Sequence, residues 1–167
     1  MPTENSIRQR HTPHKLSAYK ALTAAALATT VSACSQSASM SKDIPFSVGR
    51  NYFAKVASND GAQAFLVTSS ATRDSLLGSA AVMGKNGMPT SVDMDKQAII
   101  AIVLPDTDCP TEITPLAVQQ TAKDTVTVSF SALRHEQTSY TMRPFAMLIV
   151  DKQTVSGKVV SLEENTK

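Results

Sequence analysis

The chain has 167 residues, of which 42% are hydrophobic and 18% are charged, with two cysteines and no tryptophan. This length suits one domain with a sizeable core, the hydrophobic fraction is too high for a wholly disordered chain, and two cysteines are too few for a disulfide-built scaffold. Residues 1–33 hold four basic residues and one acidic residue, which leaves 12 basic and 13 acidic residues in 34–167, so nucleic-acid binding is not expected.

Residues 1–33 have the pattern of a secretory signal peptide. Met1–Lys20 is polar and basic, and Ala21–Ala33 is uncharged and consists mostly of small or apolar residues. A basic start, a short apolar stretch and small residues before a cleavage site are typical of such leaders, and the stretch is too short to span a bilayer. The alternative is an amphipathic or buried N-terminal helix that contains an incidental cysteine.

The junction Val31-Ser32-Ala33-Cys34 resembles the bacterial lipobox. The resemblance implies cleavage before Cys34, a diacylglycerol on its thiol and an acyl chain on the new amine, which together hold a protein firmly at a membrane. Residues 34–43 are expected to be a lipidated tether because they are mostly small and polar. The tether lacks the acidic cluster that resembles a surface-export signal in some lipoproteins. By that resemblance, an outer-membrane anchor facing the periplasm is expected.

A single globular domain is expected over residues 44–167. An amphipathic helix is predicted at 71–83, after possible N-cap hydroxyls in 69–72 and before Gly84 as a stop signal. Alternating or continuous apolar runs predict strands at 52–56, 62–68, 97–104, 112–120, 125–130, 145–150 and 158–162. The expected fold is α+β, mostly antiparallel β with one short amphipathic helix, in one compact domain.

Details of the strands sharpen this prediction. Residues 97–104 and 145–150 are apolar without alternation, so both of their faces should be covered. Lys123-Asp124 suits the turn of a hairpin between the two alternating strands at 112–120 and 125–130. Pro115 cannot donate a ladder hydrogen bond, which indicates an edge position or a bulge.

Four segments carry a resemblance to a known family: Asn51-Tyr52-Phe53, Met83–Thr90, Val92–Lys96 and Ser139–Pro144. They resemble blocks of an uncharacterised lipoprotein family of Bacteroidetes-type bacteria. The succession of a helix, "VDMDKQAIIAIVLP", a hairpin and "MRPFAMLIVDK" is also similar to the PrcB-like C-terminal domain, named after an accessory lipoprotein of a secreted protease complex. The chain departs from that pattern at 106–110, where a glycine-rich aromatic segment is usual.

Enzymatic chemistry has few candidate residues. Cys109 is the one cysteine left if Cys34 is lipidated, and the acidic Asp106 and Asp108 beside it do not favour a thiolate nucleophile. His135 is the one histidine after the leader, and no G-x-S-x-G motif accompanies it. We therefore predict no catalytic residues, with a small hydrolase or redox enzyme using Cys109 or His135 as the alternative. Residues 134–137 are interpreted as a polar hairpin tip.

No cofactor or metal is expected apart from the lipid on Cys34. Asp93 and Asp95 precede the strand at 97–104, whereas Asp106 and Asp108 follow it, and such a strand separates them by about 25 Å. A local calcium site from Asp106, Asp108 and Glu112 stays open as the less favoured interpretation.

One segment has the composition of a protein interface. Tyr140, Met142, Arg143 and Phe145 combine aromatic, thioether and guanidinium groups, which are enriched at such surfaces. The alternative is that Met142 and Phe145 belong to the core and Arg143 covers a strand end. The sequence thus predicts a non-enzymatic binding or accessory module of the cell envelope with an unidentified protein partner.

Overall fold

The computed structural model describes residues 41–165. The predicted signal peptide, the predicted lipidation site Cys34 and most of the tether predicted at 34–43 lie outside these residues. None of the helices between residues 41 and 165 has the length and apolar character that crossing a membrane requires.

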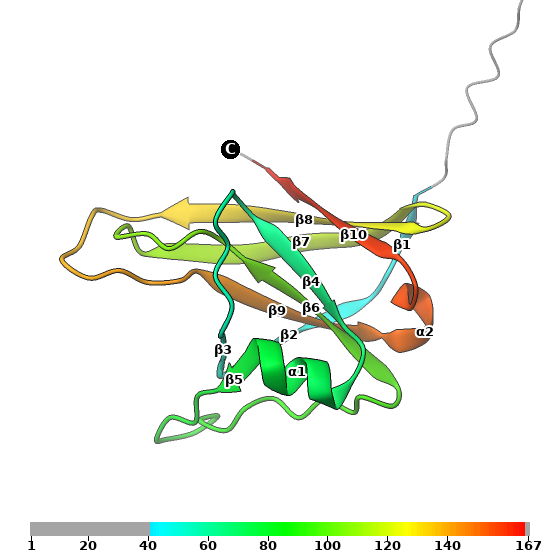
Figure 1. The fold of residues 1–167 in the computed structure, drawn as a ribbon, viewed down its shortest axis with the longest axis horizontal. Coiled ribbons are helices and arrows are strands. Elements are labelled where there is room, and N and C mark those ends of the chain that lie inside the picture. Colours follow the sequence, from blue (N-terminus) through cyan, green and yellow to red (C-terminus); the bar gives the residue numbers. More distant parts are fainter. Residues whose placement is uncertain (1–40, 166–167) are drawn as a thin grey trace, which may run out of the picture. The chain divides into compact units, whose positions relative to one another are not determined.

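The described chain forms ten strands and two short helices (Figure 1). In chain order they are β1 (Lys42–Asp43), β2 (Phe46–Gly49), β3 (Tyr52–Ala54), β4 (Gln63–Val67), α1 (Ser70–Leu76), β5 (Leu77–Ser79), β6 (Gln97–Val103), β7 (Thr111–Ala122), β8 (Thr125–Arg134), β9 (Phe145–Asp151), α2 (Lys152–Val155) and β10 (Val159–Glu164). Strand pairing therefore begins at Lys42, inside the segment predicted as a tether.

The strands form two four-stranded sheets and one small two-stranded sheet. The first sheet has the order β1-β7-β8-β10, the second has the order β2-β9-β6-β4, and β3 pairs with β5. All pairs are antiparallel except β8 and β10, which run parallel. The prediction of a mostly antiparallel β fold is confirmed.

The two strands with continuous apolar runs, β6 and β9, lie side by side in the middle of the second sheet. One face of this sheet packs against the first sheet, where Ile100 and Ile102 meet Val128 and Phe130 in one buried cluster. The other face, with Ile99, packs in a second cluster on the side of the sheet where β5 and α1 lie (Figure 1). Both faces are covered, as the sequence predicted.

The hairpin prediction is also confirmed. Ala122 pairs with Thr125, so Lys123 and Asp124 form a two-residue turn between β7 and β8. The register shifts between Pro115 and Ala117, which places a bulge next to the proline.

The helix predicted at 71–83 is wrong in its second half. Ser69 caps α1, with its hydroxyl oxygen accepting from the N–H of Thr72 at 3.1 Å, but the helix ends at Leu76 and has no buried residue. Leu77–Ser79 is a strand that pairs with β3. Gly78 faces the Phe53 ring so closely that a Cβ there would lie 2.1 Å from it. Pairing with β3 overrides the local helical spacing.

Two further differences concern connections. Residues 134–137 are not a hairpin tip, because β8 and β9 belong to different sheets and the chain crosses between them. The prediction missed β1, β2 and α2, which are each only two to four residues long.

Candidate functional site

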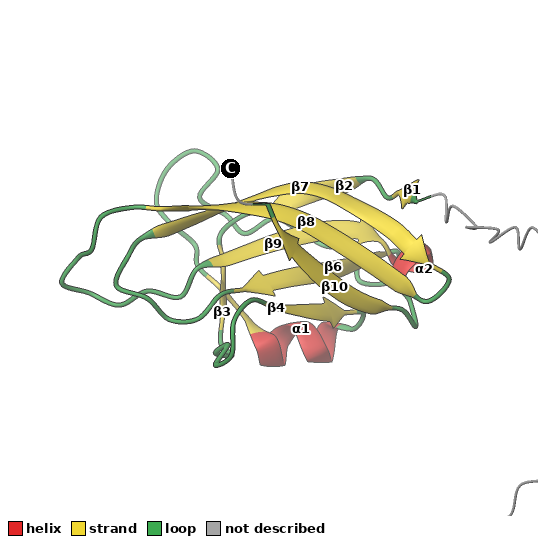
Figure 2. Cartoon of the chain, turned by 90° about the horizontal axis from the view of Figure 1, so that it is seen from above, coloured by secondary structure: helices red, strands yellow, loops and turns green. Residues whose placement is uncertain are grey.

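Two connections meet at one end of the stacked sheets: residues 104–110 between β6 and β7, and residues 135–144 between β8 and β9. Their backbones pair, with the N–H of Thr107 donating to the Met142 carbonyl at 2.9 Å and the reverse bond at 2.8 Å. Figure 2 shows both connections at the opposite end of the sheets from α2 and β1. We call these two connections the loop end; they contain five of the six residues singled out above as interface or reactive positions, namely Cys109, His135, Tyr140, Met142 and Arg143.

Arg143 fastens the loop end to the rest of the domain. Its Nε and Nη2 donate to the two carboxylate oxygens of Asp106 at 2.7 and 2.9 Å, and Nη1 donates to the Ala54 carbonyl at 3.3 Å. The hydrogen bonds between Arg143 and Asp106 lower the pKa of the Asp106 carboxyl below its usual range and raise the pKa of the guanidinium. The Arg143 side chain is only 28% exposed, so its groups are engaged within the chain.

The other residues of the predicted interface are divided between surface and interior. Tyr140 is 58% exposed, whereas Met142 is half-buried in the paired loops. Phe145 begins β9 and packs against the second buried cluster. The structure therefore brings Tyr140, Met142 and Arg143 together in one loop and places Phe145 beside the core.

Cys109 and His135 lie in neighbouring segments without forming a shared site. The backbone N–H of His135 donates to the Pro110 carbonyl at 2.8 Å. The half-buried Cys109 thiol lies 3.6 Å from an Asp108 carboxylate oxygen, and the His135 side chain is exposed. Within residues 41–165, no hydrogen bond joins the thiol to the imidazole.

Two of the three carboxylates considered for calcium, those of Asp106 and Asp108, have other partners. Asp106 binds Arg143, and the second oxygen of Asp108 accepts from Gln137 Nε2 at 2.5 Å. In the described part of the chain, no group of three His, Cys, Asp or Glu residues is arranged to hold a metal ion.

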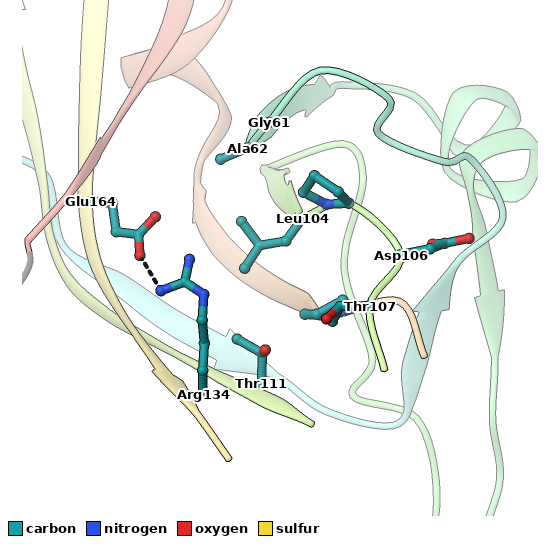
Figure 3. Close-up of a pocket in the computed structure, with 10 residues that line it drawn as sticks. Gly61, Ala62, Leu104, Asp106, Thr107, Thr111, Arg134 and Glu164 are labelled. Atoms are coloured by element: carbon teal, nitrogen blue, oxygen red, sulfur yellow. Dashed lines mark ion pairs between the residues drawn. The ribbon is translucent and has the colours of Figure 1, made fainter. Parts of the chain in front are cut away.

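A cleft of about 370 Å³ opens beside the loop end, between the ends of the two sheets (Figure 3). Leu104 and Pro144 give it an apolar part, and Arg134 and Glu164, from the neighbouring strands β8 and β10, form an ion pair of 2.9 Å at its rim. In Figure 3 the Arg134 and Glu164 side chains point toward each other, while the Asp106 carboxylate points away from the cleft. Neither Cys109 nor His135 lines it.

Sequence reasoning did not find the Arg134–Glu164 pair. The two residues come from the ends of β8 and β10, and the parallel pairing of these strands places Glu164 beside Phe130. A parallel register between strands whose first residues are 34 positions apart leaves no local pattern. In the sequence, the pair is indicated only by a charged residue at the end of each of these two strands.

The cleft lies far from the point where the described chain begins. Lys42 and Asp43 pair with Gln120 and Gln119, close to the β7–β8 turn, whereas Thr111 at the other end of β7 lines the cleft. The stretch of β7 from Thr111 to Gln119 spans about 25 Å at roughly 3.3 Å per residue.

Comparison with known proteins assigns no role to this end of the domain. No family model, no curated protein and no solved structure matches the chain. A functional conclusion therefore has to come from the chain's own residues.

Proposed function

We propose that this chain is a lipid-anchored protein of the bacterial envelope that binds another envelope or secreted protein through its loop end and cleft, without chemistry of its own. The observation that carries the proposal is the position of the cleft: it opens at the end of β7 farthest from Lys42, where the described chain begins. A domain tethered on its N-terminal side would leave this end free for a partner.

The chemistry of the cleft suits a polypeptide segment. Arg134 and Glu164 offer donors and an acceptor at the rim, with 54% and 29% of their side chains exposed. Leu104 and Pro144 supply apolar area beside them, and Tyr140 on the neighbouring loop is exposed. Aromatic and arginine side chains around a partly apolar depression are typical of protein-binding surfaces.

The anchor is the other half of the proposal. The lipobox-like Val31–Cys34 supports a diacylglycerol and an N-acyl chain on Cys34, and the short polar segment after it supports a tether. The outer membrane, facing the periplasm, is the proposed location. The resemblance to the PrcB-like domain supports an accessory role beside a protein partner rather than a catalytic one.

Site-specific photo-crosslinking in intact cells tests the binding surface. A photoreactive residue at Tyr140 or Arg134 should give a discrete protein adduct, whereas the same residue at Lys123, in the turn at the other end of β7, should not. Adducts that are absent at both Tyr140 and Arg134, or identical at all three positions, would contradict the proposal. The anchor is tested separately, because Cys34→Ala should release the protein from the membrane fraction.

A further inference from the structure

A second surface of the domain combines exposed apolar side chains with basic ones. It comprises residues 50–55, which include β3, and residues 70–90, which form α1, β5 and the connection that follows; we call it the apolar–basic layer. Nine large hydrophobic residues of the described chain are exposed, and this layer holds four of them: Phe53 at 48%, Val82 at 59%, Met83 at 102% and Met88 at 76%.

Three of these side chains lie on a turn whose backbone is fixed in place. The N–H of Val82 donates to the Gly87 carbonyl at 2.9 Å, and Asn86 has a φ of 66°. Asn51 Nδ2 donates to the carbonyls of Asn86 and Met88 at 2.8 and 2.9 Å. These hydrogen bonds fix the backbone on both sides of Met83, so the exposure of its side chain follows from the fold.

The charge of the layer is opposite to that of the rest of the domain. The layer contains four basic residues, Arg50, Lys55, Arg73 and Lys85, and one acidic residue, Asp74, which pairs with Arg73 at 2.9 Å. The remaining residues of 41–165 contain seven basic and twelve acidic residues. Lys85 is the one charged residue between positions 75 and 92, which includes the turn.

We propose that this turn inserts Val82, Met83 and Met88 into the headgroup region of an anionic phospholipid membrane, with the exposed Arg50 and Lys85 facing the lipid phosphates. A side chain that projects as fully as Met83 finds no rigid pocket on its own domain, and a fluid bilayer can close around it. Basic side chains next to an apolar tip add electrostatic attraction to anionic lipids. The contact goes beyond the proposed function and needs neither the acyl chains nor the protein partner.

The chain has no tryptophan, so Met83→Trp places a single fluorescent reporter at the tip. With the full-length chain on vesicles of phosphatidylglycerol and phosphatidylethanolamine, its emission should shift to the blue and be quenched by brominated lipid. Leu133→Trp is the matched control, since Leu133 is also exposed, at 60%, but lies at the end of β8. Its emission should stay unchanged even if the basic leader carries the protein to the vesicle. Phosphatidylcholine vesicles should have little effect on either variant.

Charge reversal separates attraction by the turn from an intrinsic preference of tryptophan for interfaces. Lys85→Glu in the Met83→Trp background should raise the lipid concentration needed for half of the blue shift by roughly fivefold or more. Equal shifts for the Met83→Trp and Leu133→Trp variants, or no shift at all, would overturn the proposal. So would a photoreactive residue at Met83 that captures a protein in cells while the tryptophan fails to respond to vesicles, because the turn would then be a protein-binding surface. Unchanged thermal unfolding of each variant would show that the fold is intact.

Discussion

At the scale of single residues, the structure gives Arg143 a different role from the interface role that the composition of residues 140–145 predicts. A surface arginine between Met142 and Pro144 looks like an interface residue, yet its guanidinium is occupied by Asp106 and the Ala54 carbonyl. The pair joins the β6–β7 connection to the β8–β9 connection, and the carbonyl bond joins both to β3. Arg143 therefore shapes the loop end from within, and Tyr140 is the exposed side chain among the four residues predicted as an interface.

This pair gives the stability of the domain a specific acid dependence. Because the pKa of Asp106 is lower in the folded chain than in the unfolded one, where it is about 3.9, the folded state gains stability above that value and loses it as the pH falls through the folded-state pKa. Asp106→Asn should be less stable than the wild type at neutral pH, and the difference should shrink toward zero in strong acid. Urea unfolding at a series of pH values measures this.

Arg143→Gln provides the control for that dependence. It removes the same hydrogen bonds from the other side, so it should flatten the same acid transition, and the double variant should flatten it no further. A difference between wild type and Asp106→Asn that stays constant down to strong acid would contradict the assignment of the transition to this pair.

Position 87 requires glycine because the surrounding backbone leaves no room for a Cβ atom. A Cβ there would lie 1.8 Å from the Val82 carbonyl oxygen, which is backbone and cannot move aside without opening the turn. Gly87→Ala should cost about 1–3 kcal/mol of unfolding free energy. Gly49→Ala is the comparison, because its Cβ would meet side-chain atoms of the buried Met147 at 2.9 Å, which can shift by rotation, and not backbone. Thermal and urea unfolding compare the two, and an equal cost would contradict this explanation.

At the scale of elements, the sequence was informative wherever the pattern was local. The apolar runs of β6 and β9 and the alternation of β7 and β8 are visible within a single strand, and the structure has all four strands. The predicted helix runs past the end of α1 because Leu77 fits helical spacing as well as Leu76 does. What ends α1 is the pairing of Leu77–Ser79 with β3, more than 20 residues upstream, and nothing in the helix itself encodes that partner.

Pro115 protects an edge that is only partly covered. β1 pairs with no more than Gln119 and Gln120 of β7, so the first half of this long strand has no outer partner in the described chain. Proline supplies no N–H for a new ladder, and the bulge beside it bends the strand, both of which discourage pairing between molecules. Pro115→Val should increase self-association at high concentration.

Light scattering coupled to size exclusion, over a range of protein concentrations, measures this effect. Thr114→Val introduces the same side chain on the same strand while keeping Pro115, so it should remain as monodisperse as the wild type. If both variants associate equally, the added apolar area and not the missing N–H would be the cause.

At the scale of the whole domain, the loop end is a product of how the sheets stack. The sequence analysis considers residues 106–110, as an acidic segment with a cysteine after a strand, separately from residues 140–145, which have the composition of an interface. Their meeting depends on β6 and β9 being neighbours in one sheet while β7 and β8 belong to the other, which makes both connections cross at the same end. Such pairings are long-range properties of the chain, and a local pattern cannot specify them.

The stacking itself depends on a few large side chains that lie between the sheets. Phe130 of β8 is fully buried in the cluster shared by both sheets, and it pairs with Pro115 and with Glu164, next to the bulge and the cleft. Phe130→Ala should therefore cost about 3–5 kcal/mol of unfolding free energy. Phe53→Ala is the comparison, since Phe53 is 48% exposed on β3 and should cost clearly less. Urea unfolding gives both values, and a similar loss for the two variants would mean that the contact between the sheets is not what holds the domain together.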